Sequence, residues 1–395
     1  MHDLPSMTTK PLKPLVYLDH NATTPCAPEV VHAMLPFLSE EFGNASSGHA
    51  MGRRGAKAVE LARKQISHAI GASIGEVFFT SGATESNNLI LRGLTDLRPR
   101  RTRIVATAVE HPSIREPCRL LSEQGFDVVE IPVTPQGVVD IDAADRVIND
   151  NTLVVCIQGA NNELGTLQPV GVLADIAHKR GALVHCDATQ MLGKVPVSLV
   201  NLDADFAAFS AHKVYGPKGV GGIFVRSGLP RSAIAAPYRG GSQEGRLRPG
   251  TINVPGIVGF GEAMRLVEER GVDDSNRLRA LRDDFEQRIK QTIPDVKTNG
   301  SLAERLPGTS SLTIPGIPAS MLLANTPDLC ISDGSACSSG AIEPSQVLLA
   351  MGLTRDDSEA TVRISFGRNN TISDVRQAVA SIALAVKAIL IQMSA

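Results

Sequence analysis

The chain alternates between short runs of apolar residues and longer segments whose apolar residues recur every three or four positions. Short apolar runs predict buried strands, and the three-to-four spacing predicts amphipathic helices. Segment 52–70 shows the helical pattern clearly, with Val59, Ala62, Ile66 and Ile70 on one face. The first half of the chain is therefore expected to alternate strand with helix.

Besides a short strand that ends in a polar turn within 16–25, seven strands and six helices are predicted before residue 226. The strands are 77–80, 104–107, 128–131, 153–158, 183–187, 204–209 and 223–225. The helices are 28–41, 52–70, 85–97, 113–124, 140–148 and 170–180. Such alternation is typical of a mainly parallel sheet that is covered by helices on both faces.

The pattern changes after Thr251. A helix-rich region, 255–292, is followed by short strands and further helices, at 309–314, 344–351, 361–366 and 373–391. A chain of 395 residues is also too long for one ordinary core. We therefore expect an α/β protein with a large domain over 24–262 and a smaller α+β domain made of 1–23 and 263–395.

Composition narrows the class of protein. Hydrophobic residues make up 43% of the chain and charged residues 20%, values typical of soluble globular proteins. The net charge of -2 gives no electrostatic reason to expect direct contact with nucleic acid or with a membrane surface. The N-terminus has no apolar signal segment, and no apolar run reaches the ~20 residues of a membrane span. We expect a cytoplasmic protein.

The cysteines predict neither a metal site nor a disulfide framework. The six are Cys26, Cys118, Cys156, Cys186, Cys330 and Cys337. They form no CxxC pair and no zinc-type Cys/His spacing. Cys337 differs from the others because it lies in a small, polar segment, 332–341. Such a segment suits an exposed nucleophile, although an incidental surface cysteine would look the same.

Polar residues stand at the carboxyl ends of five predicted strands. In open α/β sheets this is where ligands bind. The five groups are 80–84, 110–111, 161–163, 187–190 and 210–213.

Three of these groups suggest one cofactor. Lys213 follows a strand and precedes a glycine-rich turn, where an amine could attack a carbonyl or could simply be solvated. Asp187 needs a cationic partner if it is buried, or caps the next segment. The turn before Thr84 could hold a phosphate at a helix N-terminus, or be an ordinary cap. Lysine, strand-end aspartate and phosphate cradle are what pyridoxal 5'-phosphate requires.

His111 ends another predicted strand and precedes a proline. An imidazole there could stack on a planar ring or move a proton near neutral pH. A structural histidine with one satisfied hydrogen bond is the alternative.

As an ordered set, the motifs resemble the pyridoxal-phosphate-dependent cysteine desulfurases of the class V aminotransferase fold (fold type I). The resemblance extends from 17–25 to 362–368. Its markers are 80–88, 110–112, 161–165, 187–190, 210–213, 248–251 and 335–338. The short serine-rich segment around Cys337 is similar to the cluster-assembly branch. One departure is Ala211, where many members have glycine.

The resemblance implies a role for each matching residue. Lys213 would hold the cofactor as a Schiff base and later carry a proton, and Asp187 would pair with the ring nitrogen. Further cofactor contacts are implied for Gln190, His111, Ala83, Thr84, Ser210, His212, Asn162 and, from the partner subunit of a homodimer, Thr251. Substrate contacts are implied for Asn162 and Arg363, with Arg368 as second candidate for the carboxylate.

The implied reaction converts L-cysteine to L-alanine and leaves a persulfide on Cys337. The sulfur would then pass to an acceptor protein, either a scaffold for iron-sulfur cluster assembly or an enzyme of thio-modification. Two alternatives stay open: another pyridoxal phosphate enzyme of the same fold, such as an aminotransferase or selenocysteine lyase, and a non-catalytic binding partner in a sulfur relay.

Overall fold

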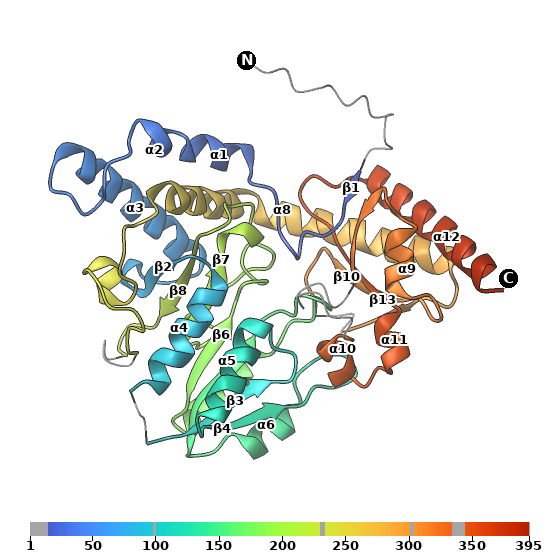
Figure 1. The fold of residues 1–395 in the computed structure, drawn as a ribbon, viewed down its shortest axis with the longest axis horizontal. Coiled ribbons are helices and arrows are strands. Elements are labelled where there is room, and N and C mark those ends of the chain that lie inside the picture. Colours follow the sequence, from blue (N-terminus) through green and yellow to red (C-terminus); the bar gives the residue numbers. More distant parts are fainter. Residues whose placement is uncertain (1–14, 98–99, 230–233, 301–303, 334–343, 395) are drawn as a thin grey trace.

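A seven-stranded sheet forms the centre of the protein (Figure 1). The computed structural model describes residues 15–97, 100–229, 234–300, 304–333 and 344–394. The strand order is β2-β8-β7-β6-β5-β3-β4, and β8 runs antiparallel to both of its neighbours. The strands are β2 (Val77–Thr80), β3 (Arg103–Thr107), β4 (Asp127–Ile131), β5 (Thr152–Gln158), β6 (Leu183–Asp187), β7 (Phe206–Ser210) and β8 (Gly221–Val225). The predicted, mainly parallel sheet is confirmed.

Helices cover both faces of this sheet. Along β5, Val155 and Ile157 face one core, whereas Val154 and Cys156 face the other. The first core is shared with α3 (Ala50–Ala69), α6 (Ile141–Val147), α7 (Val170–Lys179) and the start of α8 (Val254–Thr292). The second is shared with α4 (Ala83–Thr95) and α5 (Pro112–Glu123). A strand buried on both faces explains why β5 reads as a continuous apolar run.

A second, antiparallel sheet lies in the C-terminal part. Its order is β12-β13-β10-β9, and beside it β1 pairs in parallel with β11. The strands are β1 (Val16–Tyr17), β9 (Lys297–Thr298), β10 (Thr309–Thr313), β11 (Leu329–Cys330), β12 (Ser332–Asp333) and β13 (Thr361–Ser365). The helices are α9 (Ala319–Ala324), α10 (Gln346–Ala350), α11 (Arg355–Glu359) and α12 (Ile372–Ser394). The pairing of β1 brings the N-terminal segment back onto the C-terminal part, as predicted.

Helix α8 belongs to both parts. Its 39 residues run from the first sheet to the second (Figure 1). Phe260 and Leu266 are buried in the core of the large sheet, and Phe285 and Ile289 are buried in the core of the small one. The predicted division at residue 262 falls inside this helix and stays a prediction.

The region 28–41 differs from its predicted single helix. It forms α1 (Pro28–Met34) and α2 (Pro36–Ser39). Pro36 has no backbone N–H to continue the first helix, so the chain restarts there.

Helix α12 is, within the part of the chain that the structure describes, the one helix long and apolar enough to cross a membrane. Its residues Val375, Ile382 and Ile389 are buried in the core of the small sheet. A helix that packs in this way meets the same length criterion as a membrane span, so length and composition alone do not make it one.

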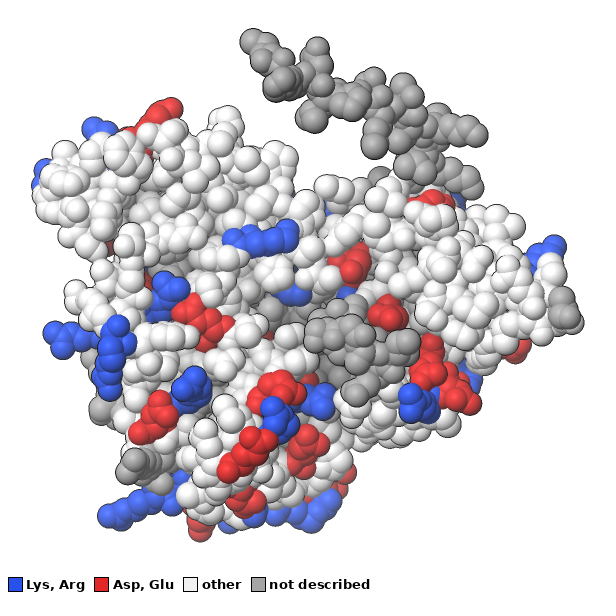
Figure 2. Space-filling model, in the orientation of Figure 1, with Lys and Arg blue, Asp and Glu red and all other residues white. Residues whose placement is uncertain are grey.

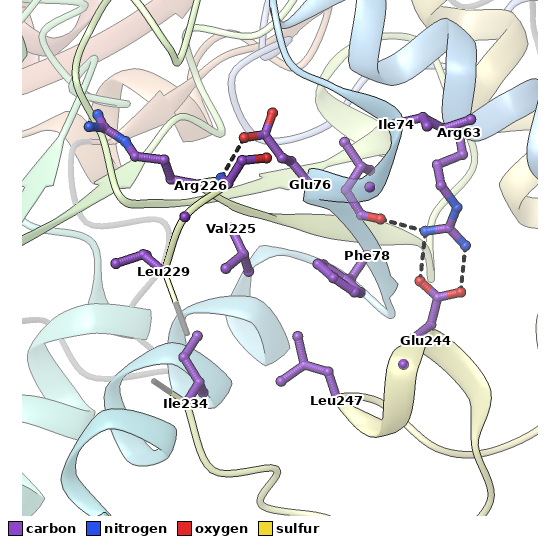
Figure 3. A pocket seen from close by; sticks show the side chains of 15 residues that line it. Arg63, Ile74, Glu76, Phe78, Val225, Arg226, Leu229, Ile234, Glu244 and Leu247 are labelled. Atoms are coloured by element: carbon purple, nitrogen blue, oxygen red, sulfur yellow. Dashed lines mark hydrogen bonds and ion pairs between the residues drawn. The ribbon is translucent and has the colours of Figure 1, made fainter. Parts of the chain in front are cut away.

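An ion pair covers the free edge of the large sheet. This edge is the side of β2 that faces away from β8. Arg63 of α3 donates to the backbone oxygen of Val77, and Glu244 accepts from the backbone N–H of Phe79 at 2.7 Å. Figure 3 shows the side chains of Arg63 and Glu244 facing each other. These two side chains occupy hydrogen-bonding groups that another strand would otherwise use.

Charged side chains of both signs are interspersed on the visible face. In Figure 2 they are most frequent over the lower part, and few lie over α1 and α3. This distribution agrees with the near-neutral total.

Candidate active site

A cavity of about 480 Å³ lies at the carboxyl ends of the parallel strands. Its walls come from the ends of β5, β6 and β7, from the turn between β2 and α4, and from β13 of the second sheet. Most residues that the sequence analysis singled out meet here.

Lys213 ends a short 3-10 turn, Ala211–Lys213, directly after β7. Its Nζ donates to the backbone oxygens of Asn21 and Ala22, at 2.6 and 2.7 Å. The N-terminal segment therefore meets the lysine of the large sheet at the cavity.

Asp187 is buried at the end of β6, with 3% of its surface exposed. Its Oδ2 accepts from Asn87 Nδ2 at 3.0 Å, and its Oδ1 accepts from the N–H of Thr189 at 3.0 Å. Asn87 Oδ1 also bonds His185 Nε2 at 2.8 Å, and burial lowers the pKa of His185 to about 4. Neutral groups thus hold the carboxylate in place.

The turn between β2 and α4 forms a second wall. The N–H of Ala83 donates to Ser210 Oγ at 3.2 Å, which joins the N-terminus of α4 to the end of β7. Gly82 has a φ of 156°, and a Cβ on Gly221 would lie 2.6 Å from the Gly82 Cα. Thr84 lies exposed on the same wall. A helix N-terminus with hydroxyls around it is suited to a phosphate.

Two histidines line the cavity, and both are shifted toward the neutral form. His111 caps α5, where its Nδ1 accepts from the N–H of Ser113, so the neutral ring carries its proton on Nε2. Burial lowers the pKa of His111, and the charge of Lys213 lowers it further, against the opposing charge of Asp187. Burial, with the charge of Lys213, lowers the pKa of His212 to about 4.

Arg363 and Asn162 form the wall nearest the second sheet. Arg363 is 2% exposed; its Nη2 donates to Asp19 Oδ1 at 2.6 Å and its Nη1 to the backbone oxygen of Asn162 at 3.2 Å. Its Nε has no hydrogen-bond partner within the described part of the chain. A buried guanidinium with a free donor is suited to a carboxylate ligand.

Thr251 and Arg368 lie outside this cavity. Thr251 lines a neighbouring hollow of about 900 Å³ that shares the Thr84 wall. Arg368 pairs with Asp274 at 2.6 Å, and its guanidinium lies 4.4 Å from the ring centre of Tyr215. Neither residue contributes to the wall of the main cavity in a single chain.

Cys337 lies outside the described residues, but both flanks of segment 334–343 are described. On one side, Ser332 of β12 stands opposite Arg363 of β13. On the other, Ser345 Oγ donates to Glu163 Oε2 at 2.5 Å, and Glu163 directly follows Asn162. Burial raises the pKa of Glu163 to about 7. Both described flanks therefore lie beside residues that adjoin the cavity.

Several residues that support the site were not predicted from the sequence pattern. Asn87 holds Asp187, and its signal was a polar residue on the apolar face of a predicted helix. Asn21 lines the cavity from a turn, and Lys194 lies behind the cavity on another turn. The hydrophobic pattern marked neither residue. Glu110, which belongs to the predicted group 110–111, is buried and accepts from Thr107 Oγ1 and from the N–H of Gln158, both at 2.6 Å.

The residues present fit pyridoxal 5'-phosphate. Asp187 is buried, and among the described residues it accepts hydrogen bonds from the neutral Asn87 amide and Thr189 N–H, which suits a cationic ring nitrogen. The buried Thr189 Oγ1 has no hydrogen-bond partner in the same described part. The cavity volume falls within the range of roughly 300–1,000 Å³ that is usual for such ligands.

Comparison with known proteins gives a consistent result. The model of the family "Aminotransferase class-V" matches residues 16–378. A protein named cysteine desulfurase IscS, from Anaeromyxobacter sp. (strain Fw109-5), is 39% identical over 91% of this chain and 89% of its own. A solved NifS-like protein superposes with a TM-score of 0.88 at 36% identity, covering 94% of this chain and 99% of the other. SspA, solved in complex with cysteine, gives a TM-score of 0.79 at 31% identity, covering 90% and 100%.

Proposed function

The chain belongs to the aminotransferase class-V family and, within it, to the cysteine desulfurases, which depend on pyridoxal 5'-phosphate, and from this we propose that it desulfurates L-cysteine through Cys337. The products are L-alanine and a persulfide on that residue. The observation that carries the proposal is the meeting of Lys213, Asp187 and the α4 N-terminus at one cavity, beside both flanks of segment 334–343.

Lys213 and Asp187 hold the cofactor in this proposal. The bound cofactor supplies an electron sink for the substrate carbon. Asp187, held in place by Asn87 and by the N–H of Thr189, would stabilise the positive ring nitrogen. Lys213 would anchor the aldehyde carbon, and its free amine would carry a proton when substrate is bound. Ala83, Thr84, Ser210 and His212, which line the cavity, would hold the phosphate.

Arg363 binds the carboxylate of the substrate. It is the arginine on the cavity wall, whereas Arg368 is held by Asp274 and Tyr215. Asn162 would assist on the same wall. Gln190 would donate to the ring oxygen, and His111 would stack on the ring and move protons from Nε2.

Sulfur transfer uses the thiolate of Cys337. The thiolate attacks the sulfur of the substrate, so an S–S bond forms as the Cβ–S bond breaks. The electron pair of the broken bond stays with the carbon, which takes a proton, and alanine leaves. The persulfide then passes to an acceptor protein, for cluster assembly or thio-modification.

The assembly that we propose is a cytoplasmic homodimer. Thr251 lies beside the Thr84 wall but outside the main cavity, a position that a second copy could use. In this arrangement Thr251 of one copy completes the phosphate site of the other.

The test compares Cys337→Ala with Cys330→Ala, which removes a thiol from β11. With cysteine and a reductant, wild type and Cys330→Ala should release alanine and sulfide in equal amounts. Cys337→Ala should keep the cofactor absorbance but release neither product, and mass spectrometry should find the persulfide on the Cys337 peptide. Normal turnover by Cys337→Ala would favour another enzyme of this fold, and a wild-type protein without the absorbance band would favour the non-catalytic alternative.

A further inference from the structure

A second lysine reaches the candidate site from behind. Lys194 lies on the turn after β6, and its Nζ donates to Asn21 Oδ1 at 2.8 Å and to Gln190 Oε1. It does not line the main cavity; with Lys213 it lines a small enclosed space of about 20 Å³ behind it. Nothing in the reaction proposed above uses this residue.

The contact with Lys194 fixes the orientation of the Gln190 amide, that is, the directions in which Oε1 and Nε2 point. The Lys194 amine donates in this contact, so the amide atom that faces it is the oxygen. The Nε2 of Gln190 then donates to the backbone oxygen of Asn21 at 2.9 Å, and that oxygen can only accept. A donor on one side and an acceptor on the other leave Gln190 one orientation.

This orientation matters because Gln190 is on the cavity wall. The residue is 4% exposed and contributes to the lining. One hydrogen of its NH₂ group is taken by Asn21, and the other is available to the cavity. With the amide reversed, an oxygen would face the cavity and could not donate to an acceptor there.

Asn21 is held by the same contact. Its Oδ1 accepts from Lys194, which directs its Nδ2 toward Asn162 O at 3.1 Å and Thr309 Oγ1 at 2.9 Å. Its backbone oxygen also accepts from Lys213 at 2.6 Å. Lys194 therefore supports two residues that touch the cavity or its lysine.

The surroundings of Lys194 disfavour its charged form, so packing alone does not explain a lysine at this position. Burial lowers its pKa well below the usual value, and the charges of Lys213 and Arg363 lower it further, while Asp19 acts in the opposite direction. A methionine of similar length would fill the same volume without this cost.

We propose that Lys194 is a positioning residue that holds the Gln190 amide with its N–H edge toward the cofactor's ring oxygen. The inference rests on the proposed cofactor site, but not on the sulfur chemistry, because Lys194 acts before any cysteine binds.

The test is a double-mutant cycle on cofactor binding without cysteine. Apoprotein of wild type, Lys194→Met, Gln190→Met and the double variant is titrated with pyridoxal 5'-phosphate. The pH at which the absorbance band of the bound cofactor changes is measured for each. Each single variant should weaken binding by about tenfold and move the band's midpoint pH upward, since a lost donor on the ring oxygen costs on the order of one hydrogen bond. The double variant should match Gln190→Met within about twofold.

Two controls separate positioning from general damage. Lys194→Arg keeps the donors and should recover most of the affinity and the midpoint, and Lys179→Met, at the exposed end of α7, should change neither. If Lys194→Met does not fold, Lys194→Gln takes its place in the cycle. The proposal would be overturned if the losses of cofactor affinity in the two single variants multiplied in the double variant. It would also be overturned if the absorbance midpoint pH of Lys194→Met equalled that of wild type. A wild type that binds the cofactor but makes no alanine would overturn the proposed function instead and leave this cycle intact.

Discussion

Arg63 and Glu244, 181 residues apart in the sequence, form a two-pronged ion pair with N–O distances of 2.6 and 2.9 Å. The pair stands where a strand would continue the sheet beyond β2 (Figure 3). Glu244 has a φ of 47°, an uncommon value for a residue with a side chain, and only 4% of its side chain is exposed. The contacts to Arg63 and to the backbone of β2 hold it there.

Glu244→Ala should therefore destabilise the protein by about 3–5 kcal/mol, because it leaves a largely buried arginine without its partner. The measurement is urea unfolding of the apoprotein. Arg119→Ala, which breaks two pairs in which every side chain is about 60% exposed, should cost less than about 1 kcal/mol. Equal losses in the two variants would mean that the edge pair contributes no more than a surface contact.

Asp187→Asn should weaken binding of pyridoxal 5'-phosphate by at least about tenfold, because a neutral amide cannot stabilise a positive ring nitrogen. Equilibrium dialysis of the apoprotein measures this loss. Asp127→Asn removes a half-exposed carboxylate paired with Arg103 and should bind as wild type does. Unchanged affinity in Asp187→Asn would remove the aspartate from the cofactor site.

Gly221→Ala should destabilise the protein by about 1–3 kcal/mol through overpacking. A Cβ there would lie 2.5 Å from the backbone oxygen of Phe209 and 2.6 Å from the Gly82 Cα, so the phosphate wall must shift. Thermal unfolding and cofactor affinity should both fall. Gly171→Ala, in α7 with no atom within 4 Å of the added carbon, should be neutral or stabilising by about 0.5–1 kcal/mol.

Glu110→Gln should change how stability depends on pH. Burial raises the pKa of Glu110 from 4.5 to about 8, with a smaller contribution from the charge of Asp187. A raised carboxyl pKa gives stability that is complete below 4.5 and is lost as pH rises toward 8. The variant should therefore gain stability relative to wild type between pH 5 and 8, as measured by thermal unfolding at several pH values. A constant difference across this range would show that Glu110 does not titrate there.

Much of the fold could be predicted because the central strands are buried on both faces. Continuous apolar runs such as 153–158 mark these strands directly, and polar residues at their ends mark the cavity edge. The small sheet was less visible, since β9, β11 and β12 have two residues each and carry no periodicity. Their pairing depends on distant segments, as when β1 meets β11.

The site residues also divide into those that the sequence pattern predicts and those that depend on contacts between distant segments. Lys213, Asp187 and the α4 N-terminus lie at strand ends, so topology alone brings them together. Asn87, Asn21 and Lys194 act through hydrogen bonds between segments far apart in sequence. Such contacts depend on side-chain geometry, which a one-dimensional pattern does not contain.

The length of α8 limits how the two halves of the molecule can move. A helix of 39 residues is about 58 Å long. Phe260 is buried in the core of the large sheet, and Phe285 is buried in the core of the small sheet. Tilting one sheet against the other would have to bend α8 or remove Phe260 or Phe285 from its hydrophobic core. Rotation of the small sheet against the large one is therefore resisted by α8.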